Sequence, residues 1–380
     1  MNELLSTFFV LLAIGVVVAG TGGCDSSTSR STSNSDSTTT LTTVWEKPYE
    51  SAGEVRLPPS TIGDSLVLFG AEARLQAFDV DDGALVWESP SVSPSILEIK
   101  GYDLLAGDSI VYAAHVRNVH AWNLRDGSHR WVFERPSDTG LYDLGYYALS
   151  PDHVFLFGNG GQILRVERAS GDRAHTWHYS EPVFGARYQD GFLYLGQAWV
   201  PEGAEGQARG GLTKVDASSG DTLWTFTTRR GGFYDMRPIV EEGRVYAGTR
   251  EGKGGFFAVD AETGEEIWRN EQAYTFAADH GGGSVYVNTS AEVMGVSKET
   301  GRTLWKTDMP GGSGFGGVVY HDGYVYHPRG GALVVLDAED GTTVHQEPSP
   351  SGYFWTIHAG AGRIFAQSSG HLVAYEPYRP

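Results

Sequence analysis

The sequence predicts an all-β protein that folds as an eight-bladed β-propeller over residues 44–380. One short motif recurs along the chain: a strand end, a tight turn, and a following strand that carries a large aromatic residue. Successive copies are roughly 40 residues apart, which leaves room for the four short strands of a propeller blade. The chain of 380 residues contains 51 glycines, and such a composition is typical of all-β folds with many turns.

The most regular copy of the motif is Ala258–Trp268, with the sequence AVDAETGEEIW. We expect Asp260 and Thr263 to bond backbone amides in the turn, and Gly264 to adopt a positive φ. Trp268 follows on a strand, where its ring is expected to dock between neighbouring blades and bury on the order of 200 Å². This interblade docking role is predicted for Trp45, Trp87, Trp131, Trp177, Trp224, Trp268 and Trp305.

A second shared element precedes each turn and consists of an alternating apolar strand after Gly or Asp-Gly, as in Asp190–Gly196. The seventh copy, Val335–His345, has histidine in place of tryptophan, and an eighth copy begins at Ala374 and ends before any tryptophan. We therefore predict that Thr42–Lys47, which contains Trp45, completes the last blade with the C-terminal strands. Seven blades remain the alternative, because the third and eighth copies are the weakest.

The N-terminal region predicts export and a lipid anchor. Phe8–Gly20 is an apolar run that is too short to span a bilayer and is typical of a signal peptide, which we assign to residues 1–23. The next residue, Cys24, lies where a prokaryotic lipoprotein signal places its lipidated cysteine. An ordinary signal peptide or an uncleaved anchor are the alternatives. Residues 24–43 are nearly all serine and threonine, which predicts a disordered tether.

Charge and composition exclude several classes of function. The formal net charge is −19, from 47 acidic and 28 basic residues. An acidic surface repels phosphates, so we expect no nucleic-acid partner. The single cysteine excludes an internal disulfide and a cysteine-rich metal site. None of the histidines and acidic residues forms a pattern that predicts catalytic or metal-binding residues.

The copies of AVDAETGEEIW resemble the tryptophan-docking motif of pyrroloquinoline-quinone (PQQ)-type β-propellers over about Thr42–Pro380. One branch of this superfamily comprises quinoprotein dehydrogenases, which bind PQQ and calcium. The other branch comprises PQQ-like repeat proteins that bind neither, including the propeller lipoproteins of the outer-membrane β-barrel assembly machinery. The dehydrogenases typically hold PQQ with a disulfide between adjacent cysteines, which this shorter chain cannot form. The resemblance therefore implies a propeller without PQQ or calcium.

Unrepeated aromatic and arginine residues lie in the connections that lead into the inner strands. In a propeller these connections converge on one face around the central channel, and such residues dominate the hot spots of protein interfaces. The alternative is that many of them fill the spaces between blades. The candidate partner-binding rim consists of Tyr142, Phe184, Arg187, Phe233, Tyr234, Arg237, Phe315, Tyr353 and Trp355.

The sequence therefore favours a non-enzymatic, extracytoplasmic propeller that is tethered to the cell membrane through a lipid at Cys24 and binds a protein partner. Two other functions stay open at this point. One is a quinoprotein-type dehydrogenase or small-ligand binder that uses the central channel. The other is an outer-membrane protein assembly factor, which is a further possibility by resemblance to the assembly-machinery lipoproteins.

Overall fold

The structure of the chain is a computed structural model, and the fold lies within the compact unit that spans 39–380. It describes residues 41–49, 58–71, 74–91, 105–106, 109–114, 118–134, 146–158, 160–203, 207–234, 237–250, 254–274, 277–289, 291–309 and 317–380. Among these residues, no helix is long and apolar enough to cross a membrane.

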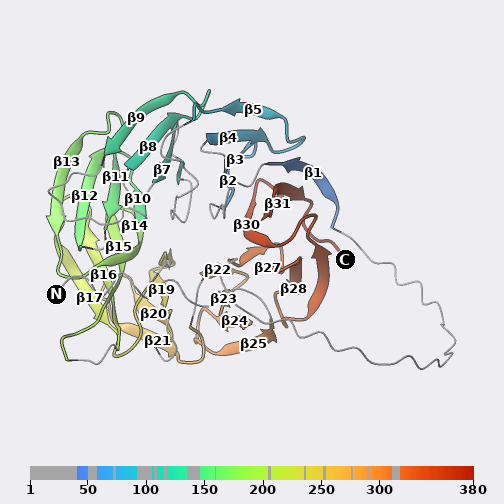
Figure 1. Cartoon of the computed structure of the whole chain (residues 1–380). Helices are drawn as coiled ribbons and strands as arrows, with labels where there is room; N and C mark the ends of the chain where they lie inside the picture. Colours follow the sequence, from blue (N-terminus) through green and yellow to red (C-terminus); the bar gives the residue numbers. More distant parts are fainter. Residues whose placement is uncertain are drawn as a thin grey trace, which may run out of the picture. The chain divides into compact units, whose positions relative to one another are not determined.

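The described residues form eight antiparallel sheets of four strands each, which follow one another around a ring in chain order (Figure 1). We number these sheets as blades 1 to 8. The prediction of an all-β, eight-bladed propeller is confirmed, and the alternative of seven blades is wrong. The third and eighth repeats look weak in the sequence, yet each forms a complete four-stranded sheet.

Seven blades are built from consecutive strands. Blade 1 comprises β2 (Ser60–Ile62), β3 (Leu66–Ala71), β4 (Arg74–Asp79) and β5 (Leu85–Glu88). Blade 2 comprises β6 (Leu105–Ala106), β7 (Ile110–Ala114), β8 (Asn118–Asn123) and β9 (His129–Glu134). Blade 3 comprises β10 (Tyr146–Leu149), β11 (His153–Phe157), β12 (Gln162–Glu167) and β13 (Arg173–His178). Blade 4 comprises β14 (Val183–Gln189), β15 (Phe192–Trp199), β16 (Arg209–Asp216) and β17 (Thr222–Thr227).

The remaining blades continue this order up to the seam of the ring. Blade 5 comprises β18 (Ile239–Glu241), β19 (Arg244–Gly248), β20 (Phe256–Asp260) and β21 (Glu266–Asn270). Blade 6 comprises β22 (Ala277–Gly281), β23 (Ser284–Asn288), β24 (Glu292–Ser297) and β25 (Thr303–Asp308). Blade 7 comprises β26 (Val319–His321), β27 (Tyr324–Arg329), β28 (Ala332–Asp337) and β29 (Thr343–Pro348). Blade 8 comprises β30 (Phe354–Gly360), β31 (Arg363–Ser368), β32 (His371–Tyr375) and β1 (Thr43–Pro48).

Blade 8 closes the ring with strands from both ends of the folded unit. Its strand order is β1-β32-β31-β30, so β1 is the outer strand, as predicted. In the pairing of β1 with β32, Trp45 lies opposite Ala374 and Pro48 lies opposite His371. The described residues begin at Leu41, three residues before the predicted start of the propeller, and Leu41 is already buried.

The core lies between blades rather than in one central mass. The first strands of successive blades are in contact at several boundaries, including β10 with β14, β22 with β26, and β26 with β30. Each apolar cluster combines residues of two adjacent blades: one contains Leu68 and Trp87 of blade 1 with Val111 and Trp122 of blade 2. Strands buried on both faces explain the nearly continuous apolar runs of the second and third strands.

The repeated turn joins each blade to the one before it. In the Ala258–Trp268 copy, the backbone N–H groups of Thr263 and Glu262 donate to Asp260 Oδ1 at 2.8 and 2.9 Å, which lowers the pKa of that carboxyl. Gly264 has a φ of +76°, and a Cβ atom there would lie 2.7 Å from the ring of Trp224 in blade 4. The turn glycine therefore supplies both a backbone conformation and a seat for the preceding blade's tryptophan.

Six of the docking tryptophans also donate their indole N–H to a carbonyl in the turn of the next blade, at 2.7–3.3 Å. The pairs are Trp45 with Val80, Trp87 with Leu124, Trp131 with Arg168, Trp224 with Ala261, Trp268 with Lys298 and Trp305 with Ala338. Trp177 differs, because His175 occupies the register that tryptophan has elsewhere. The ring of Trp177 stacks on Phe155 with centroids 6.0 Å apart and covers Gly220 of blade 4.

Candidate partner-binding rim and closure of the ring

The first group of rim residues lies where blades 3, 4 and 5 meet. Phe184, on β14 of blade 4, and Tyr234, in the connection to blade 5, have ring centroids 4.9 Å apart. Both side chains are half-buried. The guanidinium of Arg237, just ahead of β18, lies 6.0 Å from the ring centroid of Tyr147 on β10. Arg237 thus links the entry of blade 5 to the first strand of blade 3.

Arg187 and Phe233 have opposite environments within this region. Arg187 is exposed on β14. Phe233 is only 1% exposed and packs edge-on against Phe257 with centroids 6.0 Å apart. A Cβ atom at Gly210 would lie 2.7 Å from the Phe233 ring, so this glycine makes space for it. Phe233 therefore fills the core between blades 4 and 5, which is the alternative that the sequence left open for some rim residues.

The second group of rim residues lies on blade 8. Tyr353 is 59% exposed, and its ring centroid is 6.1 Å from that of Trp355. The Trp355 indole donates to Ser369 Oγ at 3.1 Å, which fixes this half-buried side chain beside the β31–β32 turn. The rim is therefore divided into two aromatic groups. The predicted rim residues Tyr142 and Phe315 and the predicted lipidation site Cys24 lie outside the described residues.

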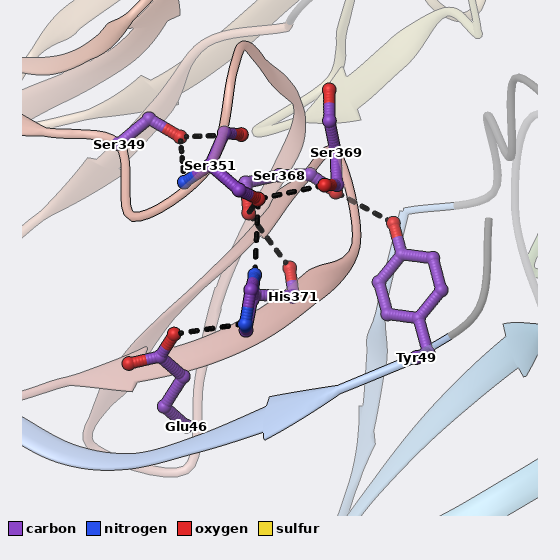
Figure 2. A network of polar contacts seen from close by, with 7 residues as sticks. All are labelled: Glu46, Tyr49, Ser349, Ser351, Ser368, Ser369 and His371. Atoms are coloured by element: carbon purple, nitrogen blue, oxygen red, sulfur yellow. Dashed lines mark hydrogen bonds and ion pairs between the residues drawn. The ribbon is translucent and has the colours of Figure 1, made fainter.

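A polar network adjoins the second group at Ser369 and contains residues that the sequence did not single out (Figure 2). Ser351 Oγ donates to the Ser369 carbonyl at 2.7 Å and lies 3.0 Å from His371 Nδ1. The other ring nitrogen of His371 is 3.4 Å from Glu46 Oε1 on β1. Tyr49 donates its hydroxyl to the Ser368 carbonyl at 2.6 Å. The network thus ties β1 to the connection and turn that carry the exposed aromatic side chains.

A charged network links the first strands of blades 5 and 6. Lys298 Nζ donates to Glu241 Oε2 at 2.6 Å, and His280 Nδ1 lies 3.3 Å from the same oxygen. The hydrogen bond from Lys298 holds the pKa of the Glu241 carboxyl below its usual range. Among the residues that the structure describes, no three histidine, cysteine or acidic side chains are grouped so that they could hold a metal ion.

The seventh docking position holds histidine and is completed by the C-terminal tail. The His345 ring stacks on Tyr378 with centroids 5.9 Å apart and an interplanar angle of 23°. The Tyr378 ring also contacts Tyr324 edge-on at 4.9 Å, and its backbone N–H donates to the Tyr326 hydroxyl at 2.8 Å. At the other seams the docking residue packs against a turn glycine, whereas at this seam it packs against Tyr378. The only sequence signal was a histidine where the repeat has tryptophan.

Comparison with known proteins identifies relatives over most of the chain. A family model described as outer membrane protein assembly factor BamB matches residues 16–182, 208–294 and 289–377. The outer membrane protein assembly factor BamB of Yersinia pestis is 24% identical over 341 residues, which cover 84% of this chain and 79% of the relative. The protein of the same description from Burkholderia pseudomallei is 23% identical over 302 residues, which cover 70% and 68%.

Solved structures share the fold at low sequence identity. BamB from Moraxella catarrhalis superposes with a TM-score of 0.70 at 19% identity, covering 88% of this chain and 97% of that one. A quinohemoprotein alcohol dehydrogenase from Pseudomonas putida HK5 superposes with a TM-score of 0.69 at 12% identity, covering 90% and 78%. Because the propeller occurs in both, the fold alone does not separate their functions. The family model matches most of the chain, and the chain belongs to the family described as outer membrane protein assembly factor BamB.

Proposed function

We propose that this chain is a non-enzymatic propeller that acts as a protein-interaction scaffold in outer-membrane protein assembly. The observation that carries the proposal is the match of most of the chain to the outer membrane protein assembly factor family. Curated relatives that share this description extend over 84% and 70% of the chain. A scaffold needs a rigid surface with side chains that bind a partner, and a closed ring of eight blades supplies the rigidity.

The rim is the surface that we assign to the partner. Tyrosine, tryptophan and arginine dominate interface hot spots because they combine large contact areas with polar groups. Tyr353 is 59% exposed, Arg187 is exposed, and the stacked pair of Phe184 and Tyr234 is half-buried. The two aromatic groups are positioned by contacts with neighbouring residues, such as the hydrogen bond from Trp355 to Ser369. The buried Phe233 packs in the core between blades 4 and 5 and supports the neighbouring Tyr234.

The proposed location is the extracytoplasmic side of the cell membrane, with Cys24 as the lipid attachment site and the serine- and threonine-rich residues that precede the buried Leu41 as the tether. The support is the sequence of the N-terminal region and the family description of an outer membrane assembly factor. Replacing Cys24 by serine in the full chain should move the protein from the membrane fraction to the soluble extracytoplasmic fraction. Retention of the Cys24→Ser protein in the membrane fraction would contradict lipid tethering.

We also propose that the protein works without PQQ or calcium. The support is the lack of a second cysteine for the disulfide that the resembling dehydrogenases use. Purified protein should show no rise in its unfolding temperature with PQQ and calcium together, and no dye-linked oxidation of alcohols. A clear thermal shift combined with oxidation would instead establish the dehydrogenase function.

The scaffold function is tested by capture of partners from native membranes with rim variants. The test variant combines Arg187→Glu with Tyr353→Ala, which alters both parts of the rim at exposed positions. Leu223→Ala is the matched control, because Leu223 is 51% exposed but lies on the outer strand β17. We expect the rim variant to lose outer-membrane assembly partners and the control to keep them, while both proteins unfold at the wild-type temperature. Unchanged capture by the folded rim variant would overturn the assignment of the rim.

A further inference from the structure

Blade 2 carries a pair of histidines that the scaffold function does not use. His120 lies on β8, and His129 lies on the adjacent outer strand β9. His120 Nδ1 and His129 Nε2 are 3.3 Å apart, and the two ring centroids are 5.5 Å apart. Each imidazole therefore presents one ring nitrogen to the other across neighbouring strands.

The propeller repeat requires neither histidine. His120 lies one residue before Ala121, which pairs with the docking residue Trp131, and His129 lies two residues before Trp131. In blades 1, 4, 5, 6 and 7 the position of His120 is occupied by Gln76, Thr213, Phe257, Met294 and Val334. The position of His129 is occupied there by Leu85, Thr222, Glu266, Thr303 and Thr343. Among these six blades the pair is specific to blade 2, so the needs of the repeat do not explain it.

Trp122 packs against both histidine rings. It lies opposite His129 in the register of β8 and β9. Its ring stacks on His120 with centroids 5.5 Å apart and contacts His129 edge-on at 6.0 Å. Trp122 is fully buried in the core between blades 1 and 2, and His120 is only 8% exposed. One member of the pair is therefore held in place by the core, whereas His129 is exposed to solvent.

The indole N–H of Trp122 has no acceptor among the residues that the structure describes. A fully buried donor without a partner is unusual, and such donors are commonly satisfied by an ordered water. The docking tryptophans differ, because each of them, like Trp87, reaches a carbonyl of the next blade or covers its turn glycine. The unpaired N–H of Trp122 therefore provides a donor for a water molecule beside the histidine pair.

The separation of the two ring nitrogens suits a shared metal ion. At 3.3 Å, it exceeds the range of about 2.7–3.2 Å that is usual for hydrogen bonds donated by N–H groups. Two nitrogens that each lie about 2.0–2.1 Å from one tetrahedral Zn²⁺ would be about 3.3–3.4 Å apart. The backbone therefore already places the nitrogens at the spacing of two metal ligands, and modest rotations of the rings direct both lone pairs at one ion.

The charged side chains that are nearest to the pair in the sequence do not compete for this place. Arg130 lies within electrostatic range of Tyr112. Asp126 accepts hydrogen bonds from the backbone N–H and the hydroxyl of Ser128. Glu134 lies at the far end of β9. Within the described part of the chain, no third histidine or acidic side chain joins the pair as a ligand, so the other positions around an ion are left to water.

We propose that His120 and His129 bind one divalent transition-metal ion of the zinc or copper class, with water in the remaining positions. Imidazole suits Zn²⁺ and Cu²⁺, whereas Mg²⁺ and Ca²⁺ prefer oxygen ligands. The exposed His129 gives the ion a path from solvent, and the net charge of −19 attracts cations to the protein. Histidine ligates a metal in its neutral form, and desolvation of the His129 ring lowers its pKa, which favours that form.

The site is separate from the surface that we assign to the protein partner. It belongs to blade 2, whereas the described rim residues belong to blades 4, 5 and 8 and to the connections that lead into them. When the ion binds to a neutral pair, the proton between the facing nitrogens moves to the other nitrogen of its own ring, so the pair releases no proton. Metal binding can therefore be measured independently of partner capture.

Isothermal titration calorimetry with Zn²⁺ and with Cu²⁺ tests the site in the purified chain, prepared without a histidine tag. We expect one equivalent of either ion to bind at neutral pH in the presence of excess Ca²⁺. The electron paramagnetic resonance spectrum of bound Cu²⁺ should show coupling to two imidazole nitrogens. The variant His129→Gln should weaken binding at least about tenfold, because the loss of a mere outer-shell partner of a ligand already costs that much.

The matched control is His153→Gln in blade 3. His153 also lies on a strand, but its Nε2 faces a glutamate oxygen, Glu167 Oε1 at 3.3 Å, rather than a second histidine. This control should bind the ion as the wild type does. An unchanged unfolding temperature verifies that His129→Gln folds, and His129→Asn repeats the test if it does not. Failure of the wild type to bind one equivalent of either ion, or equal affinity in wild type and His129→Gln, would overturn the proposal.

Discussion

A docking tryptophan is held by residues of two blades, and this explains the composition of the repeated turn. The Trp224 ring of blade 4 lies against Gly264 of blade 5, and its indole donates to the Ala261 carbonyl in the same turn. The turn thus needs a residue without a side chain for two independent reasons. One is the positive φ of Gly264, and the other is the absence of space for a Cβ atom.

These two requirements can be separated by comparing Gly264→Ala with Gly243→Ala. Gly243 has nearly the same φ, +73°, but no atom lies within 4 Å of a Cβ atom placed there. Gly243→Ala should lower the free energy of unfolding by about 1–2 kcal/mol, from backbone strain alone. Gly264→Ala should cost about 1–3 kcal/mol more, because it also overpacks the Trp224 ring. Urea unfolding measures the difference, and equal losses in the two variants would contradict the role of glycine as a seat.

The burial of the His327 side chain predicts that the free energy of unfolding falls in mild acid. It is 2% exposed on β27, and burial lowers its pKa from 6.5 to about 4, although Nδ1 donates to the Gly317 carbonyl at 2.7 Å. Between these two pH values the unfolded chain binds a proton that the folded chain does not, so stability falls as pH falls. The contribution of this residue to the free energy of unfolding is at most about 3 kcal/mol. It is fully present above pH 6.5 and lost by about pH 4.

The measurement for His327 is the free energy of unfolding of wild type and His327→Gln between pH 4 and 7. Other groups titrate in this range in both proteins, so the difference between the two curves isolates His327. We expect the variant to be less stable at pH 7 and to approach the wild type as pH falls to 4. Parallel curves at a constant separation would show that His327 does not titrate differently on folding.

At the scale of elements, the C-terminal tail replaces the repeated turn against which a docking residue packs in the other blades. Blade 8 has no turn after β32 that belongs to the repeat, because β1 supplies its outer strand. The tail residues instead cover the seam between blades 7 and 8. Tyr378 contacts His345 and Tyr324, and its backbone N–H binds the Tyr326 hydroxyl. Burial raises the pKa of Tyr326 to about 12, so this hydroxyl stays neutral at ordinary pH.

Removal of residues 378–380 should therefore weaken this seam. Two aromatic contacts and one hydrogen bond are lost, which predicts a fall of about 2–4 kcal/mol in the free energy of unfolding. Tyr378→Phe is the control, since it keeps both ring contacts and the backbone donor. Thermal unfolding followed by circular dichroism compares the two proteins. A truncated chain as stable as Tyr378→Phe would show that the tail is dispensable.

The repeated elements could be predicted from the sequence because each blade repeats the same local pattern of strands and turns. Alternation of apolar residues and Asp-Gly turns indicated the strands, and Trp45 predicted the closing strand β1. The unrepeated contacts could not be predicted. The contact of Glu46 with His371 joins residues 325 positions apart through a single pair, and no periodicity marks it. From the sequence alone, Phe233 is assigned to the rim. Its burial depends on the space that Gly210 leaves for its ring, and this contact is not visible in the sequence.

At the scale of the whole molecule, the ring is a closed series of similar seams. Each blade is buried only by its two neighbours, so the loss of one seam leaves two exposed apolar faces. The seam between blades 8 and 1 is distinctive, because it depends on a strand contributed by the other end of the folded unit. The aromatic cluster there joins Trp45 with Phe78 of blade 1 and Phe365 of blade 8, at 6.2 and 5.9 Å.

Two N-terminal truncations test how far the ring depends on this strand. Removal of residues up to 38 leaves the compact unit of 39–380 whole, and we expect the unfolding temperature to stay unchanged. Removal up to Tyr49 also takes away Trp45, whose truncation alone would cost about 3–5 kcal/mol. It also leaves β32 as an unpaired edge, which favours association between chains. Light scattering should therefore show oligomers or aggregates only for the longer truncation.

A synthetic peptide of residues 41–50 provides the decisive control for that experiment. If β1 acts as a closing strand, the peptide should bind the longer truncation, restore a monomer and raise its unfolding temperature. A peptide with Trp45→Ala should bind far more weakly, because it can pair with β32 but cannot fill the space over Gly83 of blade 1. A monomeric longer truncation that unfolds at the wild-type temperature would mean that seven complete blades and a three-stranded eighth suffice to close the ring.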